Sequence, residues 1–180
     1  GSPGRIVGIN GTVTLLTHDL RGRLVSKTVN GLETRYIYDE LGNLISAVLP
    51  GGRPTSFTYN QMNLPERVQD QDGNYLLYAY DTEGNRIREE VHDKTGALKR
   101  FMNAQYDENN RLKNITHPDG ASETTAYDGV GSVLSHTDPN SRPVHYGYDV
   151  LRRLLTLTEP GDVITRFPYD TPDHLASVPD

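Results

Sequence analysis

The chain has 180 residues, a formal net charge of −6 and eleven Tyr, but no Cys and no Trp. Without cysteine there is no disulfide framework and no thiol chemistry. A modest acidic charge spread along the chain argues against a nucleic-acid partner, which would call for a basic patch. No apolar run approaches the roughly 18 residues that a membrane span needs, so we expect no membrane insertion. Seventeen Gly and eleven Pro predict many turns and few helices.

The two ends of the chain are predicted to be incomplete. Residues 1–4 carry no targeting signal and look like a vector-derived segment that takes no part in the fold. Residues 5–18 have the pattern of a partial repeat, with Asn10-Gly11 as its turn. Residues 170–180 begin a further repeat that is cut short, so we expect a fragment of a longer array.

Between these ends a Tyr-Asp pair, once Tyr-Asn, returns every 21 residues, with one interval of 26. Such a period predicts one supersecondary unit stacked on copies of itself. The pairs are Tyr38-Asp39, Tyr59-Asn60, Tyr80-Asp81, Tyr106-Asp107, Tyr127-Asp128, Tyr148-Asp149 and Tyr169-Asp170. They divide the chain into seven repeats, at 19–38, 39–59, 60–80, 81–106, 107–127, 128–148 and 149–169.

Each repeat is predicted to hold two strands and two turns. In residues 39–59, Asp39 and Gly42 occupy the first and fourth positions of a type I turn, and Gly84 and Gly131 take the same place in their repeats. Residues 43–49 have the length of a strand, and 50–52 (Pro-Gly-Gly) are a second turn signal. Residues 55–59 alternate between larger and polar side chains, as in a strand with one aromatic face. The predicted fold class is therefore all-β, a repetitive antiparallel hairpin meander that curls.

Two places depart from the pattern. Repeat 81–106 is five residues longer than the others and carries Arg86 where its neighbours carry Leu, which predicts a bulge or a longer hairpin. Pro168 lies in an expected strand at 165–169. Because proline cannot donate to a strand ladder, we expect it at an edge or on a side that faces no partner.

The combined pattern resembles the YD repeats of the RHS family. The clearest copy runs from Tyr106-Asp107 through 108–112 (Glu-Asn-Asn-Arg-Leu) and 118–120 (Pro-Asp-Gly) to Tyr127-Asp128. The resemblance implies a segment of a hollow β-spiral shell. In bacterial polymorphic toxins and insecticidal toxin complexes such a shell encloses a cytotoxic domain, and in animal teneurins a similar shell is an adhesion scaffold. The absence of cysteine and the Arg and Asp content fit the bacterial branch better.

The resemblance also implies partners and a location. The partners are neighbouring repeats of the parent protein and an enclosed toxin domain, and the location is secreted, exported or on a bacterial surface. The Asp-Pro-x-Gly-rich self-cleavage region and the toxin domain of that family are not in this sequence. We therefore expect neither a protease nor a toxin activity here. The open edges of the sheet predict a tendency to self-associate.

The recurrent residues have both a structural and a ligand-binding interpretation. One Asp per 21 residues does not supply the six to eight clustered oxygens that calcium needs, so we expect each Asp to cap its own turn. The six histidines fall at different offsets and form no zinc motif, and neither a Gly-x-Ser-x-Gly elbow nor a cysteine is present for nucleophilic catalysis. We predict no catalytic residue, no metal and no cofactor.

The tyrosines leave two functions open. As a packing face, cross-strand aromatic pairs stabilise a sheet by about 0.2–1 kcal/mol each, which suits a non-catalytic wall segment around a cargo. As an exposed patch, the same rings would stack on a glycan in a surface-adhesion or carbohydrate-binding module. The direction of the aromatic side chains, into a packed layer or outward, is expected to distinguish the two.

Overall fold

The computed structural model describes residues 4–169, which form strands and turns without any helix. The predicted all-β antiparallel meander is confirmed, since in hydrogen-bonding order the strands follow the chain from β1 to β16. The chain divides into two compact units, residues 1–101 and 102–180. Asp170 and the expected truncated repeat after it lie outside the described residues.

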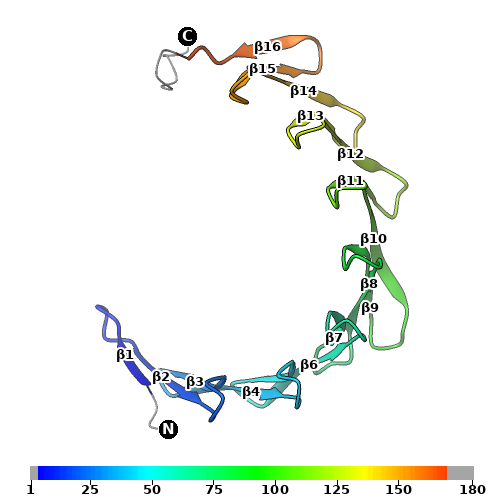
Figure 1. Cartoon of the computed structure of the whole chain (residues 1–180). Coiled ribbons are helices and arrows are strands. Elements are labelled where there is room, and N and C mark those ends of the chain that lie inside the picture. The colour runs from blue at the N-terminus through cyan, green and yellow to red at the C-terminus, as the bar shows by residue number, and fades with distance from the viewer. Residues whose placement is uncertain (1–3, 170–180) are drawn as a thin grey trace. The chain divides into compact units, whose positions relative to one another are not determined.

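The first unit is a succession of antiparallel hairpins (Figure 1). Alternating β-branched, aromatic and polar residues favour such half-exposed strands. Its strands are β1 (Gly4–Val7), β2 (Val13–His18), β3 (Leu24–Val29), β4 (Leu32–Tyr38), β5 (Leu44–Leu49), β6 (Arg53–Tyr59), β7 (Pro65–Gln69), β8 (Tyr75–Tyr80) and β9 (Arg86–His92).

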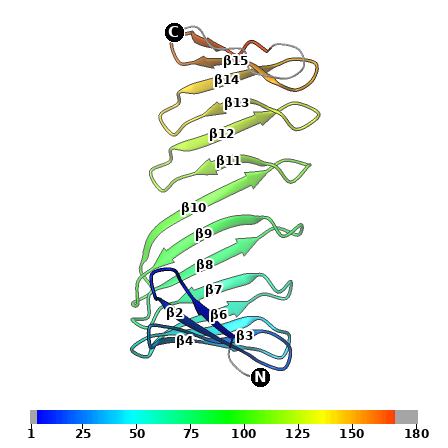
Figure 2. The same cartoon turned by 90° about the vertical axis from the view of Figure 1, so that its left-hand side faces the viewer.

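The second unit repeats the arrangement, and its turns alternate between the two ends of the strands (Figure 2). The nine-residue β10 begins in the first unit and ends in the second. The strands are β10 (Leu98–Tyr106), β11 (Leu112–Thr116), β12 (Ser122–Tyr127), β13 (Val133–Thr137), β14 (Pro143–Tyr148), β15 (Leu154–Glu159) and β16 (Val163–Arg166).

Two kinds of turn join the strands. The turns that begin at the Asp or Asn of the tyrosine pairs, together with the turn at Asp19, are called the first turns, and those at the other ends of the strands are the second turns. Before each first turn the strand register shifts by one residue, at His18, Tyr38, Tyr59, Tyr80, Tyr106, Tyr127 and Tyr148. A type I turn that ends in a left-handed residue produces this bulge. Gly42, at φ 99°, is that residue in its turn.

The sheet is a single layer with almost no interior. Among the described residues only Ala104 is buried, and large apolar side chains such as Ile37 stay about half exposed. No helix or second sheet of the described residues covers either face, so the half-buried tyrosines do not form a packed interior layer. The alternation within β6 is confirmed, since Thr55, Phe57 and Tyr59 are half-buried while Ser56 and Thr58 are exposed.

The two irregular places also have a structural outcome. The five extra residues of repeat 81–106 lengthen the hairpin of β9 and β10 around a turn at Asp93–Gly96. Arg86 pairs with Tyr80 at the position where Leu44 pairs with Tyr38. The strand expected at 165–169 ends earlier, at Arg166, and Pro168 lies between this strand and an isolated bridge at Tyr169. Proline at this position has no N–H to donate to a ladder.

Candidate functional site

Each described first turn is held by the side chain of its opening residue. In the turn of Asp39, Gly42 N–H donates to the Asp39 carbonyl (3.2 Å) and Asn43 N–H donates to Asp39 Oδ1 (2.7 Å). The same oxygen accepts from backbone N–H groups two and four residues later in the turns of Asp19, Asn60, Asp81, Asp107, Asp128 and Asp149, at 2.8–3.1 Å. These oxygens therefore serve backbone donors of their own turns.

The turn geometry lowers the pKa of the capping carboxyls. For Asp107, the backbone N–H of Arg111 is the main cause and the Arg111 side chain adds to it. For Asp39, partial burial raises the pKa, but hydrogen bonds from the side chain and backbone of Asn43 and from the turn amides outweigh it, so the net shift is downward. These carboxylates stay charged in conditions that would neutralise an ordinary Asp, because each charged form accepts several hydrogen bonds.

The tyrosines bind neighbouring hairpins where the strand ladder stops. Between β3 and β4 the ladder ends at Ser26 and Arg35, and the Tyr38 hydroxyl donates to the carbonyl of Leu24 beyond it at 2.8 Å. We call this bond the tyrosine tie. Four further ties, at 2.7–3.0 Å, join Tyr59 to Leu44, Tyr80 to Pro65, Tyr127 to Leu112 and Tyr169 to Leu154. The rings are half-buried. These tyrosines therefore join neighbouring hairpins through hydrogen bonds of their hydroxyls and not through a packed core.

An arginine that the sequence prediction missed connects consecutive first turns. Arg23 donates from Nε to Asp19 Oδ2 (2.7 Å) and from Nη1 to the Asp39 carbonyl (3.3 Å), while its guanidinium lies 4.7 Å from the centre of the Tyr38 ring. Arg111 does the same between the turns of Asp107 and Asp128, 4.6 Å from the Tyr127 ring. Arg153 binds Asp149 and lies 4.5 Å from the Tyr169 ring.

The signal for these arginines is an Arg four residues after the Asp, and it is interrupted elsewhere by Asn43 and Asn85. A second missed set lies in the second turns, where Asp70, Asp93 and Asp138 cap the backbone as the first-turn residues do. The same Asp-x-x-Gly signal marks Asp70 and Asp93 in the sequence. The second turns differ from one another more than the first turns do, so the period alone does not reveal these residues.

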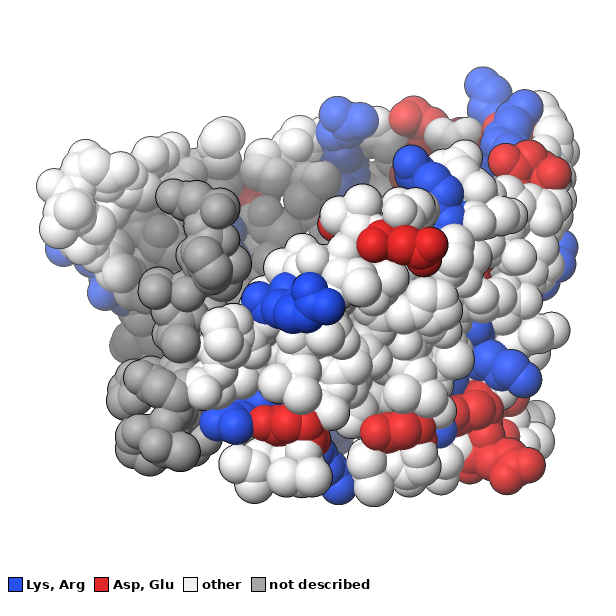
Figure 3. All heavy atoms as spheres, turned by 90° about the horizontal axis from the view of Figure 1, so that it is seen from above, with Lys and Arg blue, Asp and Glu red and all other residues white. Residues whose placement is uncertain are grey.

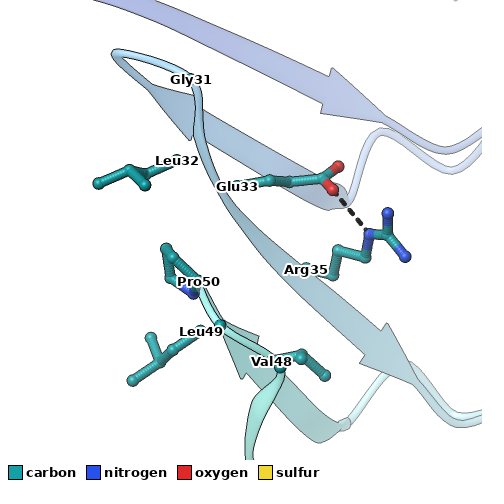
Figure 4. Close-up of a pocket in the computed structure, with 9 residues that line it drawn as sticks. Gly31, Leu32, Glu33, Arg35, Val48, Leu49 and Pro50 are labelled. Carbon is teal, nitrogen blue, oxygen red and sulfur yellow. Dashed lines mark hydrogen bonds and ion pairs between the residues drawn. The ribbon is translucent and has the colours of Figure 1, made fainter.

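A groove of the first unit lies between two second turns. It is lined by Leu32 from one hairpin and by Leu49 and Pro50 from the next, with the ion pair of Arg35 and Glu33 (2.8 Å) beside them (Figure 4). Leu32 is 63 % exposed and Leu49 is 49 % exposed. The groove opens because the ladder of β4 and β5 ends at Arg35 and Val48, and it offers apolar contact more than acid–base chemistry.

Three histidines have side-chain partners. His92 contacts Glu90 (2.7 Å), His117 contacts Glu123 (2.9 Å) and His136 contacts the Thr125 hydroxyl (3.1 Å). All three are half-buried. Over residues 4–169 we find no group of three or more His, Asp or Glu placed to hold a metal ion.

The charged residues do not gather into a region of one sign on the face seen in Figure 3, where small groups of basic and acidic side chains are separated by uncharged ones. Opposite charges also pair directly in the described residues, as Arg142 and Asp138 do at 2.6 Å. In the part of the chain that the structure describes, no helix has the length and apolarity needed to span a membrane.

A family model described as RHS Repeat matches residues 18–54, 38–74 and 127–164, together just over half of the chain. The chain belongs to the RHS repeat family. The resemblance seen in the Tyr-Asp pattern is thereby confirmed. The matched segments contain the caps Asp19, Asp39, Asn60, Asp128 and Asp149 and the ties of Tyr38 and Tyr59, so the family pattern coincides with the repeated geometry of these first turns.

Relatives of this chain include much longer toxin proteins. The tRNA nuclease WapA of Bacillus subtilis is 32% identical over 87 residues, covering 48% of this chain and 4% of the relative. The double-stranded DNA deaminase toxin A of Burkholderia cenocepacia is 29% identical over 177 residues, covering 91% of this chain and 12% of the relative. This chain thus spans only a small part of either protein.

Solved structures give the same fold. A crystal structure of TcdB2-TccC3-TEV matches 88% of this chain and 10% of its own chain, with a TM-score of 0.75 and 18% identity. The pore of the Photorhabdus luminescens Tc holotoxin, with a TccC3 mutation, matches 88% of this chain and 10% of its own with a TM-score of 0.73. The repeat fold is therefore that of these toxin-complex proteins.

Proposed function

We propose that this chain is a structural wall segment of an RHS shell that encloses a toxin or effector domain. Its recurrent Asp, Gly and Tyr residues act as construction elements: the Asp caps set the turns, the left-handed residues allow the bulges, and the five tyrosine ties join neighbouring hairpins. The single observation that carries the proposal is the recurrence of the tie, at Tyr38, Tyr59, Tyr80, Tyr127 and Tyr169, at the point where the ladder stops. A wall needs such a bond repeatedly along the chain, whereas a binding site needs it once.

The same geometry favours a non-catalytic role over glycan binding. A sugar that stacks on an aromatic ring needs an open ring face, whereas Arg23, Arg111 and Arg153 lie over the rings of three tie tyrosines. The turn carboxylates are occupied by backbone donors. The partners in this proposal are neighbouring repeats and the enclosed domain of a protein exported by a bacterium, in line with the toxin relatives.

The test is protection of the enclosed domain in the full-length protein that carries this segment. We expect that domain to resist a protease within the full-length protein and to be cleaved rapidly when it is expressed alone. Equal cleavage in both forms would contradict enclosure. A structural role without enclosure would appear as normal stability of the segment together with an unprotected domain.

A matched pair of variants connects protection to the ties. Replacing Tyr38 and Tyr80 with Phe removes two tie hydroxyls and should speed cleavage of the enclosed domain. Replacing Tyr36 and Tyr78 with Phe removes hydroxyls from the same strands as Tyr38 and Tyr80 without loss of a tie, and should leave protection unchanged. If the two pairs of substitutions changed the cleavage rate equally, protection of the enclosed domain would not depend on the ties.

A further inference from the structure

We propose that His92 is a pH-dependent clamp in the long hairpin of the first unit, joining the turn at Asp93–Gly96 to Glu90 of strand β9 in weak acid and losing one of its two bonds as the pH rises. The clamp is built on the face of the sheet that bears Leu77 and Ala79, opposite the tie tyrosines. The inference does not depend on whether the shell encloses a cargo.

Both ring nitrogens of His92 face oxygen acceptors. Nδ1 lies 3.1 Å from the carbonyl of Gly96, and Nε2 lies 2.7 Å from Oε2 of Glu90. A backbone carbonyl only accepts, and so does a charged carboxylate. A neutral imidazole has one N–H and satisfies one of the two, so only the imidazolium donates to both.

Glu90 is held in its charged form by a second cation. Arg88 Nε donates to Glu90 Oε1 at 2.5 Å, and the Arg88 guanidinium lies 4.9 Å from the ring of Phe101. The bonds from His92 and Arg88 lower the pKa of Glu90. A charged Glu90 therefore faces His92 throughout weak acid, and it does not become the donor that would let a neutral imidazole satisfy both contacts.

The imidazole plane is fixed by stacking. The rings of His92 and Tyr75 are 4.7 Å apart and within 5° of parallel, because these residues are directly paired between β9 and β8. On Tyr75 the Arg67 guanidinium lies 3.8 Å from the ring centre. Tyrosine thus lies between two cations when His92 is charged, and each cation is attracted to the aromatic ring.

The other charged groups around the clamp are mixed in sign. Arg67 on β7 opposes protonation of His92, although Tyr75 separates the two. Glu66 lies by Glu90 and Arg88. In the turn and on β10, Lys99 pairs with Asp93 at 2.7 Å, and Lys94 N–H donates to the side chain of Asn74. The bond with Glu90 outweighs these effects, so the pKa of His92 is raised, with the Gly96 carbonyl adding to the rise.

The direction of the pH effect follows from linkage. When the folded pKa lies above the unfolded value of about 6.5, the charged form contributes its full stabilisation below that value and loses it as the pH rises through the folded pKa. An upward shift therefore makes the folded population, relative to the unfolded one, larger in acid than in base. The clamp closes in weak acid and opens as the pH rises through the folded pKa.

The direct test is an NMR titration of the His92 ring in the unaltered chain, which needs no variant. We expect a pKa above the ordinary histidine value, moving down in Glu90→Gln. A folded pKa at or below the ordinary value would overturn the proposal. An unchanged pKa in Glu90→Gln would also overturn it, because Glu90 would then not be the partner that holds the proton.

Thermal unfolding gives an independent readout at about pH 5.5 and about pH 8.5, on either side of the ordinary histidine pKa. His92→Gln should lower the unfolding temperature more at the lower pH. His18→Gln, at an exposed site on β2, is the matched control and should cause similar small changes at both. A loss for His92→Gln that is equal at the two pH values would mean that His92 is merely a packing residue.

Discussion

Neighbouring hairpins separate at both ends of the strands, and different contacts join them at the first-turn end and at the second-turn end. We call these two ends the first-turn side and the second-turn side. On the first-turn side, hairpins separate after the last ladder pair, and a tyrosine hydroxyl repeatedly takes the free carbonyl beyond it, as Tyr38 does with Leu24. On the second-turn side, each pair of neighbouring hairpins has a different contact. The Asn30 side chain accepts from Val13 N–H (3.2 Å), the rings of Tyr75 and His92 stack, and the gap beside Leu49 remains an open groove.

This contrast explains where the repeat is strict. A single-layer sheet has little buried apolar area, so hydrogen bonds and turn conformations make up an unusually large part of what distinguishes the folded chain. On the first-turn side, one residue pattern supplies both the hydrogen bonds and the turn conformation, so the same residues recur in the sequence. The second-turn side is free to vary, and it is there that the long hairpin places a titratable group, His92, between Glu90 and Tyr75.

The largest effect should come from the left-handed positions of the first turns. Gly131 has φ 100°, and Gly129, in the same turn, is not in this region. Gly131→Ala should lower the free energy of unfolding by about 1–2 kcal/mol, the strain of a side chain in left-handed backbone. Gly129→Ala should be neutral or stabilising by up to about 1 kcal/mol, because it restricts the unfolded chain. Chemical denaturation measures both.

In the turn at Asp149, the left-handed position is held by an arginine, so a substitution to glycine tests the opposite effect. Arg152 has φ 63°, so Arg152→Gly removes strain and should raise the denaturation midpoint. If Gly131→Ala and Gly129→Ala had equal effects, the turn conformation would not be what the first-turn side requires.

A smaller effect concerns the charge of the caps. The pKa of Asp39 is lowered, so its carboxylate contributes stability above the unfolded pKa of about 3.9 and loses it as the pH falls through the folded value. Asn60 already caps its turn without a charge. Asp39→Asn should therefore be less stable than the original chain near neutrality, and the gap should close in acid. A gap that is constant from neutral pH to about pH 3 would contradict a role for the carboxylate charge.

The sequence carries the period, the turn residues and the strand alternation, because these depend on local backbone preferences of Asp, Gly and Tyr. The tyrosine tie could not be predicted, since it requires knowing that the ladder stops before Leu24. The role of Arg23 depends in the same way on how far apart two turns lie. The absence of a core could not be predicted from the sequence. A strand has the same alternating pattern whether the face with the larger side chains is covered by another layer or left half-exposed. The role of His92 could not be predicted either, because it depends on the register between β8 and β9, which sets His92 opposite Tyr75.

The tyrosine tie is tested most directly by two tyrosines of one strand. Tyr38 and Tyr36 lie two residues apart on β4, and both rings are half-buried, but only Tyr38 donates to a carbonyl of the neighbouring hairpin. Tyr38→Phe should lower the free energy of unfolding by about 1 kcal/mol, the net worth of a hydrogen bond whose acceptor loses its partner. Tyr36→Phe should change it by less than about 0.5 kcal/mol. If the two variants unfold at the same denaturant concentration, the hydroxyl of Tyr38 does not hold the hairpins together.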